Sequence, residues 1–334
     1  MILSYIYLLL FATLAKSAYG GVTKAGTATE AQNGDGRGAI ARQKCAEYAR
    51  SVHSLVTLPT LTSDQKLANV SHCGITSEPL IVSSSVARRH EFPHMAAVGF
   101  DKEGGGIDWL CGGTLVSEIW VLTAAHCVHS PHAGSASWVR VGDLNLDSTT
   151  DDASPEDRRV IERIKYPRYK LPVKYHDIAL LRLESRVPFN AGIRPACLPS
   201  GPNSGSDNVK AIATGWGTRD WGETERSSEL KKITMPIVDY QSCNASWSTG
   251  STSRNLPNGV VDEWQICAGD SVADTCQGDG GSPLVVYSKK EHCMYDVIGI
   301  VSLGKLCHGG IPGLHTRVYY YIPWIESVVW PQGS

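Results

Sequence analysis

Three stretches of the sequence carry residues whose types and spacing could perform acyl transfer. His126 follows one apolar run, Asp177 precedes another, and a glycine-rich loop covers residues 276–283. A buried aspartate fixes the tautomer of a histidine, the histidine accepts the proton of a hydroxyl nucleophile, and the N–H groups of a tight loop bind the oxyanion. The three stretches therefore predict one active site built from parts that lie far apart in the sequence.

A second candidate for chemistry is the H-E-x-x-H spacing of His90 and His94, which zinc hydrolases use. That motif needs both histidines on one face of a helix. Pro93 lies inside it and disfavours helix at Phe92, and the strand-like run 95–98 follows directly. We assign no metal to this motif and expect no cofactor.

The elements that must position these residues are predicted to be short strands. From residue 81 onward, runs rich in β-branched and aromatic residues alternate with Gly, Pro, Asn and Asp turns, which is typical of an all-β domain. These runs are 95–100, 115–122, 138–141, 178–183, 210–214 and 297–303. Only 320–330 has helical spacing, with Ile322, Ile325, Val328 and Val329 on one face.

Charge and cysteine content restrict the class of protein. The 334 residues include 31 basic and 33 acidic side chains, so nothing indicates nucleic-acid binding. The ten cysteines form an even set that fits disulfides in an oxidising compartment. The composition therefore favours a disulfide-bonded globular protein.

The start of the chain predicts secretion. Residues 2–14 form a short apolar run that ends before Ala18 and Gly20, so we expect residues 1–20 to be a signal peptide. The run is shorter than the roughly 20 apolar residues of a spanning helix, so no membrane association is expected. Residues 21–43 are interpreted as flexible and 44–80 as an ordered arm that carries Cys45 and Cys73. Two N-glycosylation triplets begin at Asn69 and Asn244.

The chemistry-bearing stretches together resemble the chymotrypsin-like (trypsin-like, S1) serine protease family over residues 81–334. Besides His126, Asp177 and the glycine-rich loop, the matching motifs are Cys111-Gly112-Gly113 and Gly215-Trp216-Gly217. The resemblance implies an all-β, chymotrypsin-like double six-stranded β-barrel with a C-terminal helix, preceded by a short disulfide-tethered N-terminal arm. It also implies the triad roles for these residues, with His126 as the base and Asp177 as the carboxylate that orients it.

Finer motifs are similar to those of snake-like, clip-type serine protease homologues of insects. They are Glu91–Ala97, Gly142–Leu146 and Tyr321–Glu326. Such proteins usually carry a clip domain with six cysteines, whereas two cysteines precede residue 81 here. We therefore interpret residues 21–80 as a flexible segment and pro-arm without a full clip domain.

The glycine-rich loop departs from the family at the position that matters most. Active members read Gly-Asp-Ser-Gly-Gly-Pro, and this chain reads Gly278-Asp279-Gly280-Gly281-Ser282-Pro283. The resemblance thus puts Gly280 at the nucleophile position, and Ser282 follows two residues later. Extended residues advance about 3.3 Å each, while a misplacement of about 1 Å can cost about 100-fold. We predict a non-catalytic homologue; the alternative is an active endopeptidase that uses Ser282.

The resemblance also implies a peptide cleft. The N–H groups of Gly278 and Gly280 would form an oxyanion-hole-like nest, and Asp274 would lie at the base of the primary pocket. There a carboxylate pairs with Arg or Lys, so the active alternative would cleave after these residues. The other expected pocket residues are Ser302, Gly304 and Gly313, with Leu303 and His315 in place of the usual aromatic residues.

Activation and disulfides are carried over in the same way. The bond between Leu80 and Ile81 aligns with the activation cleavage site, and Asp279 would pair with the new amine. The pairs implied by resemblance are Cys111–Cys127, Cys243–Cys267, Cys276–Cys307 and Cys73–Cys197, which leaves Cys45–Cys293. Asp143, Asn145, Asp151 and Asp152 match a loop that binds calcium in some relatives, and we predict a solvated acidic loop instead.

The sequence therefore favours a secreted, non-catalytic serine protease homologue that acts as a binding cofactor, decoy or regulator. The expected setting is an extracellular proteolytic cascade in insect immunity, melanisation or venom. Its partners would be extracellular proteases, zymogens or inhibitors. The competing hypotheses are an active secreted trypsin-like endopeptidase and a circulating binder of microbial surfaces.

Overall fold

A computed structural model describes most of the chain. The described residues are 37–58, 66–71, 73–74, 84–151, 153–202, 210–218, 225–248, 254–270, 278–304 and 310–331. All of them belong to one compact unit. The predictions for the signal peptide, the Leu80–Ile81 bond, Asp274 and the Cys276–Cys307 pair lie outside the described residues.

The first β-barrel is formed by residues 95–183. Its strands are β4 (Met95–Asp101), β5 (Ile107–Leu115), β6 (Trp120–Thr123), β8 (Gly134–Val141), β9 (Glu156–Lys165) and β10 (Ala179–Leu183). They pair in the order β4-β5-β6-β10-β9-β8, and β4 also pairs with β8, which closes the ring. The short β7 (His129–Ser130) extends β8 at the edge.

Strand β4 shows how the sequence builds both faces of this barrel. Side chains alternate along a strand. Val98 and Phe100 pack inside the first barrel, whereas Met95 and Ala97 belong to a separate cluster that also contains Val285 and Ile300 of the second barrel. The strand is therefore apolar on both faces because it lies between two cores.

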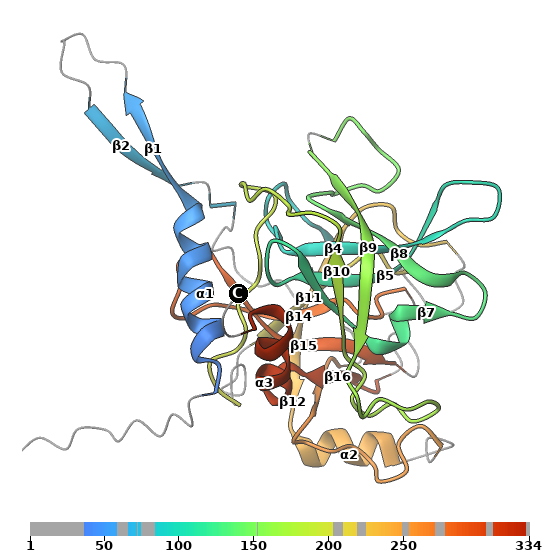
Figure 1. The fold of residues 1–334 in the computed structure, drawn as a ribbon. Coiled ribbons are helices and arrows are strands. Elements are labelled where there is room, and N and C mark those ends of the chain that lie inside the picture. Colours follow the sequence, from blue (N-terminus) through green and yellow to red (C-terminus); the bar gives the residue numbers. More distant parts are fainter. Residues whose placement is uncertain are drawn as a thin grey trace, which may run out of the picture. The chain divides into compact units, whose positions relative to one another are not determined.

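The second β-barrel follows the same plan. Its strands are β11 (Lys210–Gly215), β12 (Lys231–Val238), β13 (Gln265–Ala268), β14 (Pro283–Tyr287), β15 (Tyr295–Leu303) and β16 (Gly313–Arg317). The order is β11-β14-β15-β16-β13-β12, pairing of β11 with β12 closes the ring, and β3 (Ser85–Val86) lies at the edge of β12. The predicted double six-stranded β-barrel is confirmed (Figure 1).

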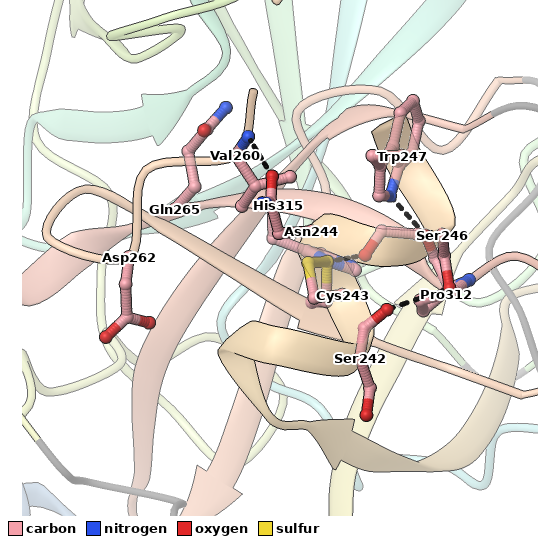
Figure 2. The surroundings of a disulfide bond; sticks show 12 residues. Ser242, Cys243, Asn244, Ser246, Trp247, Val260, Asp262, Gln265, Pro312 and His315 are labelled. Atoms are coloured by element: carbon pink, nitrogen blue, oxygen red, sulfur yellow. Dashed lines mark hydrogen bonds between the residues drawn. A yellow bond between two sulfur atoms is a disulfide. The ribbon is translucent and has the colours of Figure 1, made fainter. Parts of the chain in front are cut away.

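The C-terminal helix α3 (Val318–Val329) confirms the helical spacing of the sequence, with Ile322, Ile325 and Val329 buried. Helix α2 (Tyr240–Ser248) was not predicted, because its Ser and Asn residues are weak helix formers. Tertiary contacts hold it: Cys243 is bonded to Cys267, and the Trp247 indole donates to the Pro312 carbonyl at 3.0 Å (Figure 2). Among the described residues, no helix has the length and apolar character needed to cross a membrane.

The N-terminal arm begins with a helix that the sequence interpretation missed. Helix α1 (Ala39–Ala49) is followed by a 3₁₀ turn (Arg50–Val52) and by the hairpin of β1 (His53–Leu58) and β2 (Lys66–Ser71). The prediction of a flexible segment up to residue 43 is therefore wrong from Ala39 onward. The Gly- and Ala-rich composition concealed a buried stripe at Ala41, Cys45 and Tyr48, which has helical spacing.

Helix α1 is fixed to the C-terminal helix α3 (Figure 1). The Ala41 N–H donates to the carboxylate of Glu326 at 2.8 Å. The Trp330 indole donates to the Tyr48 hydroxyl at 3.2 Å. Burial, the largest influence, raises the pKa of Tyr48. The arm is thus an integral part of the described fold.

Two predicted disulfides are wrong. The structure pairs Cys45 with Cys197 and Cys73 with Cys293, whereas the sequence suggested the opposite combination. All four cysteines lie in one cluster with Tyr48, Val52 and Met294, so sequence spacing did not distinguish the partners. The core pairs Cys111–Cys127 and Cys243–Cys267 form as expected.

Candidate active site

His126 and Asp177 meet at the edge of the first barrel. Thr123 of β6 pairs with Ala179 of β10, so the residues just after β6 lie beside those just before β10. His126 Nδ1 is 2.7 Å from Asp177 Oδ2, and the His126 backbone N–H donates to Oδ1 at 2.9 Å. These two contacts fix the orientation of the imidazole ring.

Asp177 is fully buried and is also held from the second barrel. The Ser302 hydroxyl, on β15, donates to Asp177 Oδ2 at 2.7 Å, and the Thr316 hydroxyl donates to the Asp177 carbonyl at 2.8 Å. Burial raises the pKa of Asp177, but the charge of His126 and the hydrogen bonds from His126 and Ser302 outweigh it and lower the pKa below its ordinary value. Asp177 therefore carries a negative charge that orients His126.

The residue before Asp177 makes the turn that aims this carboxylate. His176 has a positive φ of 59°, which is uncommon for a residue other than glycine. Its ring is buried, and Nδ1 lies 2.9 Å from the hydroxyl of Tyr321 on α3. Through this contact, helix α3 holds the backbone next to Asp177 in place.

The glycine-rich loop places Gly280 against the imidazole. The Gly112 N–H donates to the Gly280 carbonyl at 2.9 Å, which ties the loop to β5. A Cβ atom on Gly280 would lie 2.6 Å from His126 Nε2. The loop position that faces Nε2 therefore carries no side chain.

Two backbone donors of this loop are unused. Gly278 has a φ of 93°, a conformation that glycine adopts readily. Within the described part of the chain, the N–H groups of Gly278 and Gly280 donate to no acceptor. They remain available to an oxygen atom of a ligand.

The Ser282 side chain packs against strands β5 and β11. It is buried, with 1% of its surface exposed, and its hydroxyl has no hydrogen-bond partner among the described residues. Cβ atoms on Gly112 and Gly215 would lie 1.9 and 3.1 Å from its Oγ. The Ser282 hydroxyl is thus enclosed between two glycines of β5 and β11.

Asp279, expected to pair with a new amine after activation, is held by the backbone in this structure. The Gly217 N–H donates to Asp279 Oδ1 at 2.9 Å. The carboxylate packs so closely that a Cβ on Gly217 would lie 2.6 Å from its Cγ. The Gly215-Trp216-Gly217 motif thus provides the space that Asp279 occupies.

The predicted pocket residues are only partly described. Ser302 supports Asp177, Gly304 is exposed just after β15, and Gly313 begins β16. His315 is fully buried, and its Nδ1 donates to the Gly313 carbonyl at 3.1 Å. Burial lowers the pKa of His315 to about 4, so its ring is neutral at physiological pH.

Arg226 lies beside the site and was not identified from the sequence. Its Nη1 donates to the Trp109 carbonyl at 3.0 Å, and a Cβ on Gly278 would lie 3.2 Å from its Cζ. No motif or periodicity pointed to this residue, because contacts between loops leave no regular spacing in a sequence.

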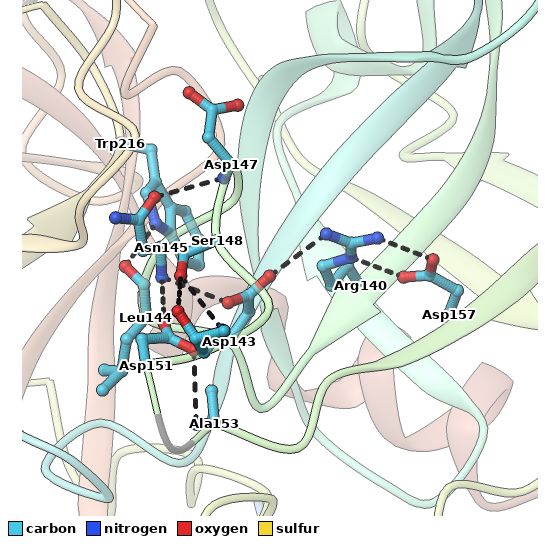
Figure 3. Close-up of polar contacts among 11 residues, drawn as sticks. Arg140, Asp143, Leu144, Asn145, Asp147, Ser148, Asp151, Ala153, Asp157 and Trp216 are labelled. Atoms are coloured by element: carbon cyan, nitrogen blue, oxygen red, sulfur yellow. Dashed lines mark hydrogen bonds and ion pairs between the residues drawn. The ribbon is translucent and has the colours of Figure 1, made fainter.

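The acidic loop after β8 is organised by an arginine (Figure 3). Arg140 pairs with Asp157 through two nitrogens, at 2.7 and 2.9 Å, and with Asp143 at 3.2 Å. Asp143 is buried, and burial raises its pKa, so the prediction of a solvated loop is wrong at this residue. The Asn145 N–H donates to both Asp143 and Asp151. Asp152 lies outside the described residues.

The H-E-x-x-H segment does not form a helix. Residues 89–94 form turns and a bend ahead of β4, and His90 has a positive φ of 61°. His94 is buried beside Phe92 and Tyr295, and burial lowers its pKa to about 3. The helical geometry required for the zinc motif is thus missing here.

Comparison with known proteins gives consistent matches. The family model described as Trypsin matches residues 81–325. The chain is 37% identical to serine protease snk of Drosophila melanogaster over 88% of its own length and 66% of the relative's. It is 31% identical to CLIP domain-containing serine protease B4 of Anopheles gambiae, over 87% and 82% of the two chains. It is 30% identical to phenoloxidase-activating factor 3 of Holotrichia diomphalia, over 81% and 78%. The chain spans 38% of serine protease Hayan, so some relatives are much longer.

Proposed function

The chain belongs to the trypsin family, and from this premise we propose that it is a non-catalytic member that acts by binding proteins of an extracellular protease cascade. One observation carries the proposal: Gly280 is the residue whose Cβ would face His126 Nε2, and it has no hydroxyl. In the acyl-transfer mechanism, the histidine takes its proton from a serine at this place. We assign Gly280 to the nucleophile position.

The remaining serine of the loop does not substitute for it. The Ser282 hydroxyl is buried between Gly112 and Gly215 and has no hydrogen-bond partner among the described residues. Loss of the nucleophile alone lowers turnover by on the order of 10⁶-fold in a triad enzyme. Asp177 therefore orients the His126 imidazole, which has no nucleophile to activate.

The retained scaffold supports a binding role. The contacts of Asp177 with His126 and Ser302 are present without a hydroxyl at residue 280, and so are the barrel disulfides Cys111–Cys127 and Cys243–Cys267. Relatives bear names such as clotting factor G beta subunit, phenoloxidase-activating factor 3 and venom serine protease. By analogy, we place this chain in an immune, melanisation, clotting-type or venom cascade, as a cofactor, decoy or regulator of proteases, zymogens or inhibitors.

The compartment and processing belong to the same proposal. Secretion through residues 1–20, glycans at Asn69 and Asn244 and cleavage after Leu80 are proposed from the sequence. The disulfides fit an oxidising, extracellular location. In the structure, Asn244 Oδ1 accepts a hydrogen bond from the Val260 N–H at 3.0 Å (Figure 2).

Peptide hydrolysis tests the catalytic half of this proposal. The protein, cut between Leu80 and Ile81, is incubated with a fluorogenic peptide ending in arginine, beside a His126→Ala variant as matched control. We expect the same background rate from both. Faster turnover by the parent chain, abolished in His126→Ala, would establish the alternative, an active trypsin-like endopeptidase.

Affinity capture tests the binding half. The tagged full chain is mixed with the body fluid or venom of its source, and the retained proteins are identified. The control is a tagged trypsin-like enzyme whose catalytic serine has been blocked. We expect the chain to retain more proteases, zymogens or protease inhibitors than this control does. Retention of bacterial cell wall alone would favour a binder of microbial surfaces instead.

A further inference from the structure

Arg226 brings a positive charge directly to the glycine-rich loop. A Cβ on Gly278 would lie 3.2 Å from both Cζ and Nη1 of Arg226, so the guanidinium rests on this glycine. Nη1 donates to the Trp109 carbonyl, which holds the side chain in place. Among the described residues, Arg226 makes no ion pair and no further hydrogen bond. Most of its five N–H donors are therefore available to a ligand.

Other donors converge on the same short loop. The N–H groups of Gly278 and Gly280 donate to no described acceptor. Nδ1 of His126 is engaged by Asp177, so the free nitrogen, Nε2, faces Gly280. Nε2 becomes a donor and the ring becomes a cation when the imidazole is protonated. The loop thus offers two backbone N–H groups of its own, with a guanidinium against Gly278 and an imidazole against Gly280.

The carboxylates around this cluster are already engaged. Asp177 is fully buried beneath His126 and accepts the Ser302 hydroxyl. Asp279 accepts the Gly217 N–H, and Asp108 lies 3.4 Å from the ammonium group of Lys102. Desolvation lowers the pKa of Arg226, and attraction by Asp279 and Asp108 opposes this. Arginine stays charged under these conditions.

We propose that Arg226, His126 and the N–H groups of Gly278 and Gly280 bind the free C-terminal carboxylate of a peptide. This inference rests on the proposed loss of the nucleophile, because a serine at residue 280 would project between the loop and Nε2. A carboxylate offers two oxygens and a full negative charge, which suit a guanidinium and neighbouring N–H groups. An uncleaved peptide bond offers one neutral carbonyl oxygen, which a guanidinium binds less strongly than a carboxylate.

The class of reaction that supplies such a ligand follows from its chemistry. Hydrolysis of a peptide bond consumes one water molecule and leaves a new carboxylate on one fragment and a new amine on the other. The chain would therefore hold the newly exposed ends of proteins that a protease has already cut. Without a nucleophile it would neither rejoin nor cleave them.

Matched peptides test this site. An acetylated peptide ending in arginine is prepared as the free carboxylate, as the carboxamide, and with two further residues after the arginine. Dissociation constants are measured calorimetrically for the full chain and for the Arg226→Gln and Arg226→Lys variants. Arg186→Gln is the control, because the Arg186 side chain is 80% exposed and its ion-pair partner among the described residues is Glu118, which is no part of the proposed site.

We expect the carboxylate to bind about ten- to a hundredfold more tightly than the carboxamide, as charged hydrogen bonds do. Arg226→Gln should remove most of this preference, Arg226→Lys should keep part of it, and Arg186→Gln should leave it unchanged. Equal binding of the two forms, a preference that survives Arg226→Gln, or binding of neither form would overturn the inference. Cleavage of the extended peptide would instead contradict the proposed function, so the two failures are distinguishable.

Discussion

A Cβ atom on Gly280 would lie 2.6 Å from Nε2 of His126, closer than such atoms approach in folded proteins. The imidazole is held there by Asp177, which contacts both Nδ1 and the backbone N–H of His126. The site therefore lacks room for a Cβ atom at residue 280 as well as the hydroxyl. The His126 ring lies too close to Gly280 for a side chain to fit without a shift.

Gly280→Ser should therefore restore only a small part of peptidase activity. The new side chain requires the clamped ring to recede by several tenths of an ångström, and a misplacement of about 1 Å can cost about 100-fold. After cleavage between Leu80 and Ile81, we expect measurable turnover of an arginine peptide, up to about 100-fold below that of an intact trypsin-like enzyme. Gly280→Ala, which adds the Cβ without the hydroxyl, is the control. Full activity of Gly280→Ser would show that the ring moves freely.

Ser282→Ala should leave function unchanged and should not lower stability. The Ser282 hydroxyl is buried without a described partner, and a buried unsatisfied polar group costs about 1–3 kcal/mol. Thermal unfolding of the parent and the variant measures the change, which we expect to be zero or stabilising. A loss of peptidase turnover in Ser282→Ala would identify this serine as a nucleophile.

Gly112→Ala should be strongly destabilising. Its Cβ would meet Ser282 Oγ at 1.9 Å, inside the interface between the loop and β5. Overpacking of this kind costs about 1–3 kcal/mol. Ser282→Gly removes both the Oγ and the Cβ of the opposing residue, so the double variant should recover much of the midpoint of thermal unfolding. No recovery would mean that Gly112 is required for another reason.

Disulfide mapping should find Cys45 linked to Cys197 and Cys73 linked to Cys293. Both bonds join the arm to the barrels, so cleavage between Leu80 and Ile81 should not release it. The Cys45→Ser/Cys197→Ser double variant should keep the arm through the second bond, as non-reducing mass spectrometry of the cut protein would show. Peptides linking Cys45 to Cys293 would contradict the structure.

Stability should fall as the pH drops from about 6.5 toward 4. Burial lowers the pKa of His94 to about 3 and that of His176 and His315 to about 4. In this range the unfolded chain binds protons that the folded chain excludes, which favours unfolding by about 1.4 kcal/mol per pH unit for each histidine. Burial raises the pKa of Asp296 to about 6, so the folded chain binds a proton there first and offsets one histidine.

The midpoint of thermal unfolding, measured at pH 7.5 and pH 5, checks this balance. His94→Phe keeps an aromatic ring beside Phe92 and Tyr295 but removes one of the three excluded protons. The variant should therefore lose less stability than the parent between the two pH values. The same loss in both proteins would show that His94 does not contribute.

The fold and the centre of the site were predictable because they depend on local patterns. Alternating apolar runs gave the strands, and the motifs around His126 and Asp177 fixed where these strands must place them. Other features depend on contacts that no spacing encodes. Four cysteines share one cluster, so their pairing depends on how α1 packs. Arg226 reaches Gly278 from a separate loop, and the buried Asp143 pairs with Arg140, which is itself held by Asp157 of the neighbouring strand β9.

Covalent labelling by an arginine-mimicking phosphonate, which reacts with serine nucleophiles of this family, tests directly whether the chain has a nucleophile. The chain is cut between Leu80 and Ile81, treated at concentrations that fully label an active trypsin-like enzyme, and analysed by mass spectrometry of the intact protein and its peptides. We predict no adduct, because Gly280 has no hydroxyl and Ser282 is enclosed. One adduct per chain on Ser282, with matching peptide turnover, would show that the protein is an active peptidase that uses this serine.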